Sequence, residues 1–543
     1  MVKSSGSSSS ECVRGLYERM RPYIPLLATW LIAILCIVRG MTIGEFDFNI
    51  DEPDHAATGL YFHDLLLDHP VTHPVEYTYL YYAHYPSLGL IHWPPFFHFC
   101  EGVMFLLFQP SVVTARVTIL LFALLGLYFW LRFLSELHGP WIGALATLFL
   151  ALAPGVLLYE KVVMLEVPSL ALCIAASYFW FRYLRTEESK AAYWFGLFAA
   201  LALVTKQNSI YLAPFCLLTI IASGKWRLLL RRPTIIAVAI CLFLAGPFYV
   251  LAFRLHAGTI SKDVLNASVS EISRFTFYFL TLPGQLGWPL LVLSVLGIVT
   301  YRLWDKDRNA KFMMLWIVAS YLTLTFVGVK SARYAIYWIP PFIYFAVAPL
   351  SAFRGRLRFS ASVVMAGLLA TTISSSWFYQ RPYISGYAAA ARRITELSAS
   401  GFILFDGDLP GNFIFFVRRY DPGHRFFVLR KALYTGQIMP QYGSEELLHT
   451  ERDLNDLITR YGIRFAVVSE KTPLVFPVQA ALRTLLSSNQ FRFVERFTVD
   501  TNQSVWTGDN LLLYENNHPA KPSGNSLTIK MMTLPHDITV PVE

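Results

Sequence analysis

Charged residues are scarce in this chain of 543 residues. Asp, Glu, Lys and Arg make up 15% of it and hydrophobic residues 55%, whereas soluble domains carry roughly 25% charge. The six cysteines form no Cys-x-x-Cys pair and none follows residue 241, which argues against a disulfide framework or a zinc finger. No small-residue cleavage site follows the apolar run 23–38, so we expect a retained membrane span and not a signal peptide.

Long apolar windows recur through the first two-thirds of the chain. Their lengths, about 17–25 residues, suit helices that cross a bilayer. We therefore predict a mainly α-helical polytopic membrane protein with about eleven spans, and a shorter apolar helix at 96–108 that lies at the membrane interface. With this assignment, the basic residues of alternate loops fall on the side of the basic N-terminus, as the positive-inside rule requires. The net charge of +9 follows from these loops, and we expect no nucleic-acid partner.

The pattern divides the chain into four parts. We predict a cytoplasmic tail at 1–22, a transmembrane domain at 23–380 with its first external loop at 41–111, a non-cytoplasmic α/β domain at 381–516 and a flexible tail at 517–543. The segment 254–285 is predicted to be a further external loop. In the α/β domain, strands are expected at 402–405, 425–429, 464–468, 491–499 and 511–514, and helices at 387–398, 444–460 and 477–488.

The first external loop contains an unusual concentration of carboxylates. Asp51 and Glu52 lie in the stretch 45–55, which also contains Asp54 and His55, and His92 lies two residues before Pro94-Pro95. Carboxylates near a membrane are costly to desolvate unless they are paired, hydrated or bound to a metal. Other polar residues at span ends are predicted to face the same compartment: Glu166, Lys206, His256, Arg333 and Tyr334.

In their order along the chain, these motifs resemble the integral-membrane GT-C glycosyltransferases. The similarity is to the protein O-mannosyltransferase and lipid A aminoarabinose transferase group, and it covers most of residues 24–380. It consists of the adjacent Asp51-Glu52, the Pro94-Pro95 turn, the acidic motif 159–168 that ends in Leu165-Glu166-Val167-Pro168, Thr205-Lys206, and Arg333-Tyr334. One departure is Trp93, which stands before Pro94-Pro95 where the group usually has Lys or His.

The resemblance implies transfer of a sugar from a polyprenyl-phosphate donor to an acceptor at the non-cytoplasmic face. It implies Asp51 as the general base, with Glu52 and Glu166 assisting, positioning the acceptor or binding a cation. Lys206 and Arg333 would hold the donor phosphate. His55, His92 and Tyr334 are further candidates for substrate binding, and which of Asp51, Glu52 and His55 is the base stays open. A divalent metal is an open possibility, with Glu52, Glu166 and His256 as candidate ligands.

The chemistry of sugar transfer calls for the same residue types. Attack of an acceptor oxygen on an anomeric carbon needs a base within hydrogen-bond reach. The donor is a phosphodiester whose phosphate leaves as an anion, so cations or a metal must stabilise its developing charge. Each residue also has a structural interpretation: Asp51, Glu52 and Glu166 could cap helices, and Lys206 and Arg333 could extend to the interface.

A transporter or flippase of a lipid-linked substrate is the alternative function. Such proteins tend to show paired halves and charges inside spans, whereas this sequence has no duplicated half and its acids lie in predicted external loops. We therefore predict an enzyme in the inner or plasma membrane of a prokaryote, with its N-terminus cytoplasmic. The acceptor, whether lipid, glycan or protein, and the sugar are not defined by the sequence.

Overall fold

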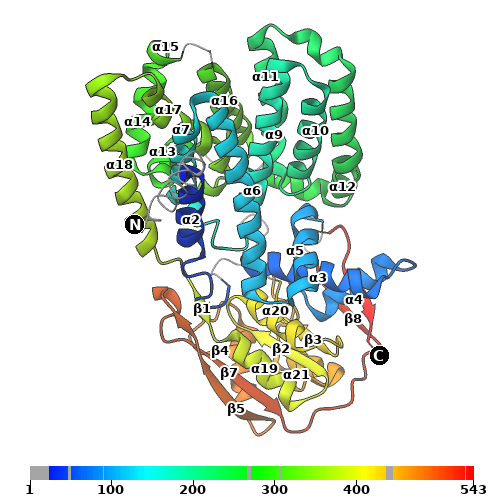
Figure 1. Ribbon diagram of the computed structural model, residues 1–543. Helices are drawn as coiled ribbons and strands as arrows, with labels where there is room; N and C mark the ends of the chain where they lie inside the picture. The colour runs from blue at the N-terminus through cyan, green and yellow to red at the C-terminus, as the bar shows by residue number, and fades with distance from the viewer. Residues whose placement is uncertain are drawn as a thin grey trace, which may run out of the picture.

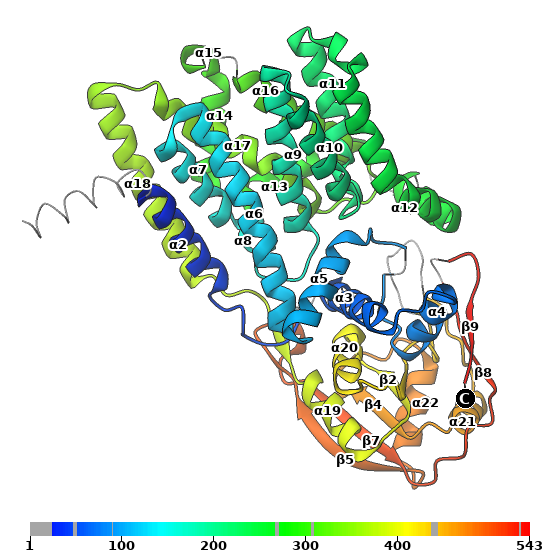
Figure 2. The same cartoon turned by 45° about the vertical axis from the view of Figure 1, so that its right-hand side comes forward.

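The computed structural model describes residues 24–46, 51–89, 91–265, 271–305, 309–435, 444–531 and 534–542. A helical bundle forms one end of the molecule and a domain built on a mixed β-sheet forms the other (Figure 1). The helices of the first external loop lie between the two (Figure 2). This arrangement confirms the predicted combination of a mainly helical part with a small C-terminal α/β domain.

The bundle accounts for most of the helices. It consists of α2 (Ile24–Val38), α6 (Val112–His138), α7 (Pro140–Leu152), α8 (Pro154–Leu157), α9 (Glu166–Thr186), α10 (Ser189–Leu203), η1 (Gln207–Tyr211), α11 (Leu212–Ser223), η2 (Trp226–Leu230), α12 (Arg232–Leu265), α13 (Glu271–Leu286), α14 (Trp288–Val299), α15 (Tyr301–Trp304), α16 (Asn309–Phe326), η3 (Ala332–Trp338), α17 (Ile339–Val347), η4 (Ala348–Ser351) and α18 (Gly355–Phe378).

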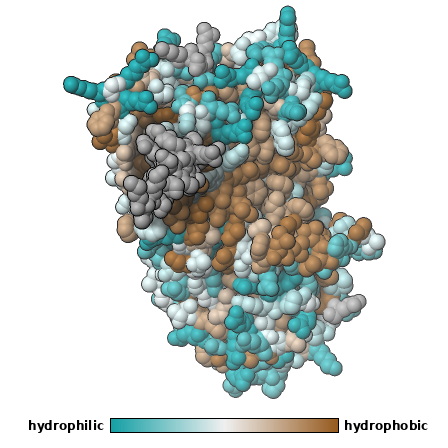
Figure 3. All heavy atoms as spheres, viewed as in Figure 1, coloured by the Kyte–Doolittle hydropathy of each residue, from teal (hydrophilic) through white to brown (hydrophobic). Residues whose placement is uncertain are grey.

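Several of these helices can span a membrane. Among the described residues, five are long and apolar enough, and the pair α13–α14, bent by 118°, makes a sixth candidate. Shorter apolar helices accompany them. Hydrophobic side chains gather over the bundle, whereas the end opposite the β-sheet domain and much of that domain are hydrophilic (Figure 3). The chain is thus an integral membrane protein, and the count of about eleven spans stays a prediction.

The segment 254–285, predicted to be an external loop, is largely helical, because α12 continues to Leu265 and α13 begins at Glu271. The apolar span within α12 ends at Leu255, and the external position of the segment stays a prediction. Polar residues interrupt the apolar face of α13, so no continuous apolar run in the sequence marks it as a helix.

The first external loop is largely helical. It contains α3 (Asp51–Asp68), α4 (Pro74–His84) and α5 (Phe96–Phe108), the last with the predicted bounds. Helices α3 and α5 approach closely because glycines lie at their contact: a Cβ on Gly59 would meet the Glu101 carboxylate, and one on Gly102 would lie 2.8 Å from the backbone nitrogen of His63. This close contact fixes α3, whose first turn carries Asp51 and Glu52.

The C-terminal domain has a five-stranded sheet in the order β3-β2-β4-β7-β5. Strands β2, β3 and β4 are parallel, and β7 pairs antiparallel with β4 and β5. All five predicted strands are confirmed, as β2 (Gly401–Asp406), β3 (Phe426–Leu429), β4 (Phe465–Ser469), β5 (Phe491–Thr498) and β7 (Asn510–Asn516). The other elements are β1 (Ile384–Ser385), α19 (Tyr387–Leu397), α20 (Pro410–Tyr420), α21 (Glu451–Tyr461), α22 (Pro477–Leu486), β6 (Asp500–Thr501), η5 (Ser504–Trp506), β8 (Ser526–Ile529) and β9 (Ile538–Pro541).

Two contacts join this domain to the first external loop. Helix α20, which the sequence did not predict, packs on α3, and the guanidinium of Arg418 donates from Nε to Asp64 Oδ2 at 2.8 Å. Strands β8 and β9 pair with each other and β9 contacts α4. The expectation of a flexible tail at 517–543 is therefore wrong for these strands, because their short apolar runs bury residues such as Leu527 and Ile538.

Candidate functional site

Four charged side chains from distant parts of the chain meet at the start of α3. Arg333 donates from Nη1 to Asp51 Oδ2 at 2.6 Å, and its Nε lies 3.6 Å from Glu166 Oε1. Lys206 donates from Nζ to the same Glu166 oxygen at 2.5 Å. Two carboxylates thus alternate with two cations in one continuous cluster, which we call the charge cluster: Asp51, Arg333, Glu166 and Lys206.

Each member of the charge cluster stands at the end of a helical element. Asp51 and Glu166 begin α3 and α9, where a negative charge is favoured by the helix dipole. Lys206 directly precedes η1, and Arg333 lies in the first turn of η3. Glu166 is fully buried, while Asp51 and Arg333 keep side-chain exposures of 23% and 19%. The cluster therefore has a closed end at Glu166 and an accessible end at Asp51.

The aromatic ring of Tyr334 lies close to both Arg333 and Lys206. Its ring centroid is 5.5 Å from the guanidinium carbon of Arg333 and 5.6 Å from Lys206 Nζ. An aromatic face at this distance attracts a cation without neutralising it. The predicted residues Asp51, Glu166, Lys206, Arg333 and Tyr334 are thus brought together, and an anion that approaches the cluster would meet two positive groups.

Glu52 points away from the charge cluster. Its Oε1 accepts a hydrogen bond from the backbone N–H of Val163 at 3.0 Å and lies 3.6 Å from Arg116 Nε, and both side chains are fully buried. Arg116 also donates to the carbonyl oxygens of Met41 and Glu45. The pair ties α3 to α6 and to the segment before α9. Sequence reasoning missed Arg116, although a lone arginine inside an apolar span signals a buried partner.

His55 lies on a buried face of α3. Its Nδ1 is 3.0 Å from His98 Nε2, and its ring centroid is 4.0 Å from that of Trp93. Burial lowers the pKa of His55 well below its usual value, and the nearby His98 and Lys206 lower it further. His55 is therefore neutral at neutral pH and has little affinity for an additional proton.

His92 is placed at the turn that precedes α5. Its carbonyl oxygen accepts a hydrogen bond from Gln207 Nε2 at 2.7 Å, and the residue after Lys206 is thereby joined to the Pro94-Pro95 turn. The backbone N–H of Phe96 donates to the carbonyl of Val204 at 2.9 Å. These two bonds hold the turn against the segment that carries Lys206.

Asp54 connects the site to the C-terminal domain. It accepts a hydrogen bond from Ser87 Oγ, and a Cβ on Gly411, in the first turn of α20, would lie 2.7 Å from its Oδ1. Burial raises the pKa of Asp54 to about 6, while Arg430 lowers it. Asp54 was not among the predicted site residues, because a carboxylate one helical turn from Asp51 carries no distinctive spacing.

The metal candidates do not form a site in the described part of the chain. No group of three or more His, Cys, Asp or Glu side chains there could hold a metal ion. Glu52 contacts Arg116 and Val163, and Glu166 contacts Lys206 and Arg333. Protein cations thus lie beside one oxygen of each carboxylate, Oε1 of Glu52 and Oε1 of Glu166. The side chain of His256 lies outside the described residues.

Comparisons with known proteins give one family match. Residues 92–250 match the family model of the dolichyl-phosphate-mannose-protein mannosyltransferases. A search of curated protein sequences gives no match. The family match confirms the predicted resemblance and the predicted enzyme class, a membrane glycosyltransferase.

Solved structures share the fold over nearly the whole chain. ArnT from Cupriavidus metallidurans bound to undecaprenyl phosphate has a TM-score of 0.62 at 12% identity, over 92% of this chain and 99% of that chain. Its apo state has a TM-score of 0.60 at 14% identity, over 90% and 97% of the two chains. An Archaeoglobus fulgidus oligosaccharyltransferase in complex with Zn and sulfate gives 0.50 at 12% identity, over 81% and 67%.

These likenesses agree with one another. Residues 92–250 are similar to the membrane glycosyltransferases of the dolichyl-phosphate-mannose-protein mannosyltransferase family, and the chain shares the fold of ArnT.

Proposed function

We propose that this protein transfers a sugar from a polyprenyl-phosphate-linked donor to an acceptor hydroxyl at the non-cytoplasmic face of the membrane. The charge cluster is the observation that carries the proposal, because it places one accessible carboxylate beside two cations. The family match over residues 92–250 and the fold shared with an ArnT that binds undecaprenyl phosphate support the donor class.

Asp51 is the proposed base. The acceptor hydroxyl loses its proton to Asp51 as its oxygen bonds to the anomeric carbon, and the bond from that carbon to the phosphate oxygen breaks. Of the three candidates, Glu52 is fully buried against Arg116 and His55 has a strongly lowered pKa. Asp51 alone of these three combines partial exposure with a position in the charge cluster.

Arg333 and Lys206 are proposed to receive the phosphate of the leaving group. The planar guanidinium of Arg333 can present two N–H donors to phosphate oxygens, and Lys206 adds a point charge. Glu166, fixed between the two, sets their separation. The donor is a phosphodiester, and the released product is polyprenyl phosphate, a phosphomonoester anion that leaves without an additional proton.

The proposed orientation places the N-terminus in the cytoplasm and the C-terminal domain outside. Basic loops support it: Lys225 and Arg231 pair with Glu187 at 2.8 and 2.7 Å, and this group joins loops that the positive-inside rule assigns to the cytoplasm. The proposed domain limits remain a transmembrane unit at 23–380, with its external loop at 41–111, and an external domain at 381–516.

The test is turnover of defined donors by the purified protein in lipid nanodiscs. Polyprenyl phosphates that carry different radiolabelled sugars are supplied with a membrane extract as the source of acceptor, and nucleotide sugars serve as the control donors. Consumption of one lipid-linked donor, with none of the nucleotide sugars, is the expected result. A flippase would instead move a fluorescent polyprenyl phosphate across reconstituted vesicles and leave every donor intact.

A further inference from the structure

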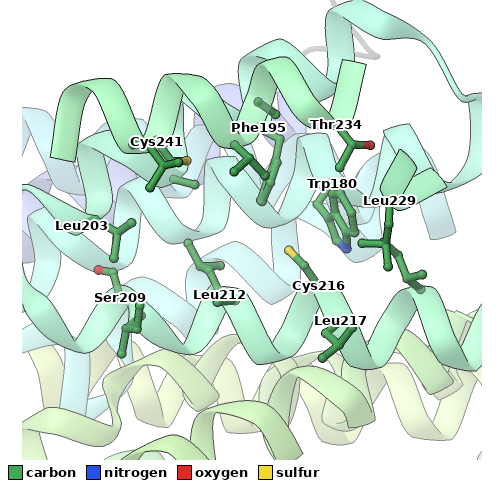
Figure 4. A pocket seen from close by; sticks show the side chains of 17 residues that line it. Trp180, Phe195, Leu203, Ser209, Leu212, Cys216, Leu217, Leu229, Thr234 and Cys241 are labelled. Carbon is green, nitrogen blue, oxygen red and sulfur yellow. The ribbon is translucent and has the colours of Figure 1, made fainter. Parts of the chain in front are cut away.

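The sugar of the proposed donor needs a surface beside the charge cluster. An apolar cavity of about 300 Å³ lies next to Lys206, between α9, α10, α11 and α12: Ser209, which lines it, donates from its backbone N–H to the Lys206 carbonyl at 3.1 Å. Its walls are almost entirely apolar, with side chains such as Trp180, Phe195 and Leu212 (Figure 4). A sugar would leave its hydroxyl groups without hydrogen bonds in this cavity, so another surface must receive it.

Trp93 is an uncharged, partly exposed side chain at the edge of the charge cluster. Its ring centroid lies 4.0 Å from that of His55, which follows Asp51 by four residues and therefore lies on the same side of α3. In addition to burial, the charges of Lys206 and Arg333 lower the pKa of His55, so both cations lie near this imidazole. Trp93 thus adjoins the proposed base and the proposed phosphate-binding groups.

The backbone holds the Trp93 ring against α3. The N–H of Gly89 donates to Thr58 Oγ1 on α3 at 3.3 Å, and a Cβ at Gly89 would overlap the Trp93 ring. Because glycine has no Cβ, the ring rests on the Gly89 backbone as well as on His55, and both contacts come from the α3 side. Two hydrogen bonds also join the turn of Trp93 to the segment 204–207. The part of the indole that stays exposed is therefore directed away from α3.

An exposed indole is well suited to contact a sugar ring. The face of a hexose presents C–H groups, and these weakly positive hydrogens are attracted by the negative potential above an aromatic ring. The contact also removes apolar area from water on both partners. Lys206 and Arg333 already supply two cations for the phosphate, whereas the uncharged Trp93 offers no partner to an anionic group. The residue types therefore separate a site for phosphate from a site for a neutral ring.

We propose that Trp93 binds the sugar ring of the lipid-linked donor and selects a neutral sugar with one ring face free of axial hydroxyl groups. The inference rests on the proposed function and adds the class of sugar to it. The phosphate stays with Lys206 and Arg333, and the ring lies on Trp93. Its anomeric carbon then faces the acceptor at Asp51. A carboxylate on the sugar would lose water at Trp93 without gaining a cation, and the nearby Asp51 would repel it.

The test measures the binding of lipids that differ only in the sugar. Wild type, Trp93→Ala and Trp93→Phe in nanodiscs are titrated with polyprenyl-phosphate glucose, mannose and galactose, and with polyprenyl phosphate that carries no sugar. For the tightest of the three hexoses, we expect Trp93→Ala to raise Kd about tenfold and Trp93→Phe about twofold, with Kd for the sugar-free lipid unchanged in both. Trp226→Ala, which removes an exposed tryptophan from η2, is the matched control and should change neither Kd.

A second comparison tests the selection of a neutral sugar. Polyprenyl-phosphate glucuronate should bind wild type about tenfold more weakly than the glucose lipid, and Trp93→Lys, which supplies a cation, should narrow this difference. Equal weakening of the hexose and sugar-free lipids by Trp93→Ala would show that the ring only supports its turn, and would overturn the inference. So would unchanged binding of the hexose lipids by that variant, or equal binding of glucuronate and glucose lipids by wild type. If wild type binds none of these lipids, the proposed donor class itself is refuted.

Discussion

Arg333→Lys tests the geometry of the charge cluster without removing its positive charge. The guanidinium reaches Asp51 Oδ2 at 2.6 Å with Nη1 and lies 3.6 Å from Glu166 with Nε, whereas a lysine ammonium is a single point charge. One charge-assisted hydrogen bond is lost, which contributes about 1.5–3 kcal/mol. We therefore expect kcat/KM for the lipid-linked donor to fall about 10- to 100-fold, since 1.36 kcal/mol corresponds to tenfold in rate.

The assay is initial-rate kinetics with the purified variant in nanodiscs, together with a thermal melt. The melting temperature should change little, because lysine keeps a positive charge beside both carboxylates. Arg132→Lys is the matched control: its ion pair with Glu136 is about half exposed on both sides, and such pairs contribute at most about 1 kcal/mol. Wild-type kcat/KM in Arg333→Lys would refute the reasoning, and so would an equal loss in the control.

Three further predictions concern the links between the C-terminal domain and the site. Burial raises the pKa of Asp54 to about 6, and its ionisation adds negative charge near Asp51, the proposed base, and strengthens that base. Wild-type kcat/KM should therefore rise as pH increases through 6, and Asp54→Asn should lack that inflection in a pH–rate profile. Gly411→Val introduces a Cβ that clashes with Asp54, so kcat should fall with donor KM unchanged, whereas Gly367→Ala, which meets no atom within 4 Å, should be silent in the same kinetics. Asp64→Asn leaves the buried Arg418 without its carboxylate and should destabilise the domain by about 3–5 kcal/mol, measured as a lower unfolding midpoint in denaturant.

The sequence was most informative where one face of an element is uniformly buried. Strands β2, β3 and β4 read as short continuous apolar runs, as parallel strands covered on both faces do. Helix α5 was predicted at its observed bounds because Pro95 and Gln109 flank a largely apolar stretch. By contrast, α13 and α20 mix polar and apolar residues, and tertiary contacts, such as that between α20 and α3, stabilise them.

The site residues were predicted as types, but their pairing was not. Nothing in the spacing of Asp51 and Arg333, which are 282 positions apart, shows that their side chains form a hydrogen bond. Likewise, the sequence did not separate Asp51 from Glu52, although one faces the charge cluster and the other is directed toward Arg116. Adjacent residues at the start of a helix point about 100° apart, so their environments depend on which helices surround them.

The measurement that tests the central claim most directly is the turnover of the preferred lipid-linked donor by Asp51→Asn, together with binding of that donor. Asparagine keeps the size of the side chain and can still accept a hydrogen bond from Arg333, but it is a very weak base. We predict a loss of about 10²–10⁴-fold in kcat, with the donor still bound at close to the wild-type Kd. Turnover by Asp51→Asn at the wild-type rate would contradict the account, because a group other than Asp51 would then accept the proton of the acceptor hydroxyl.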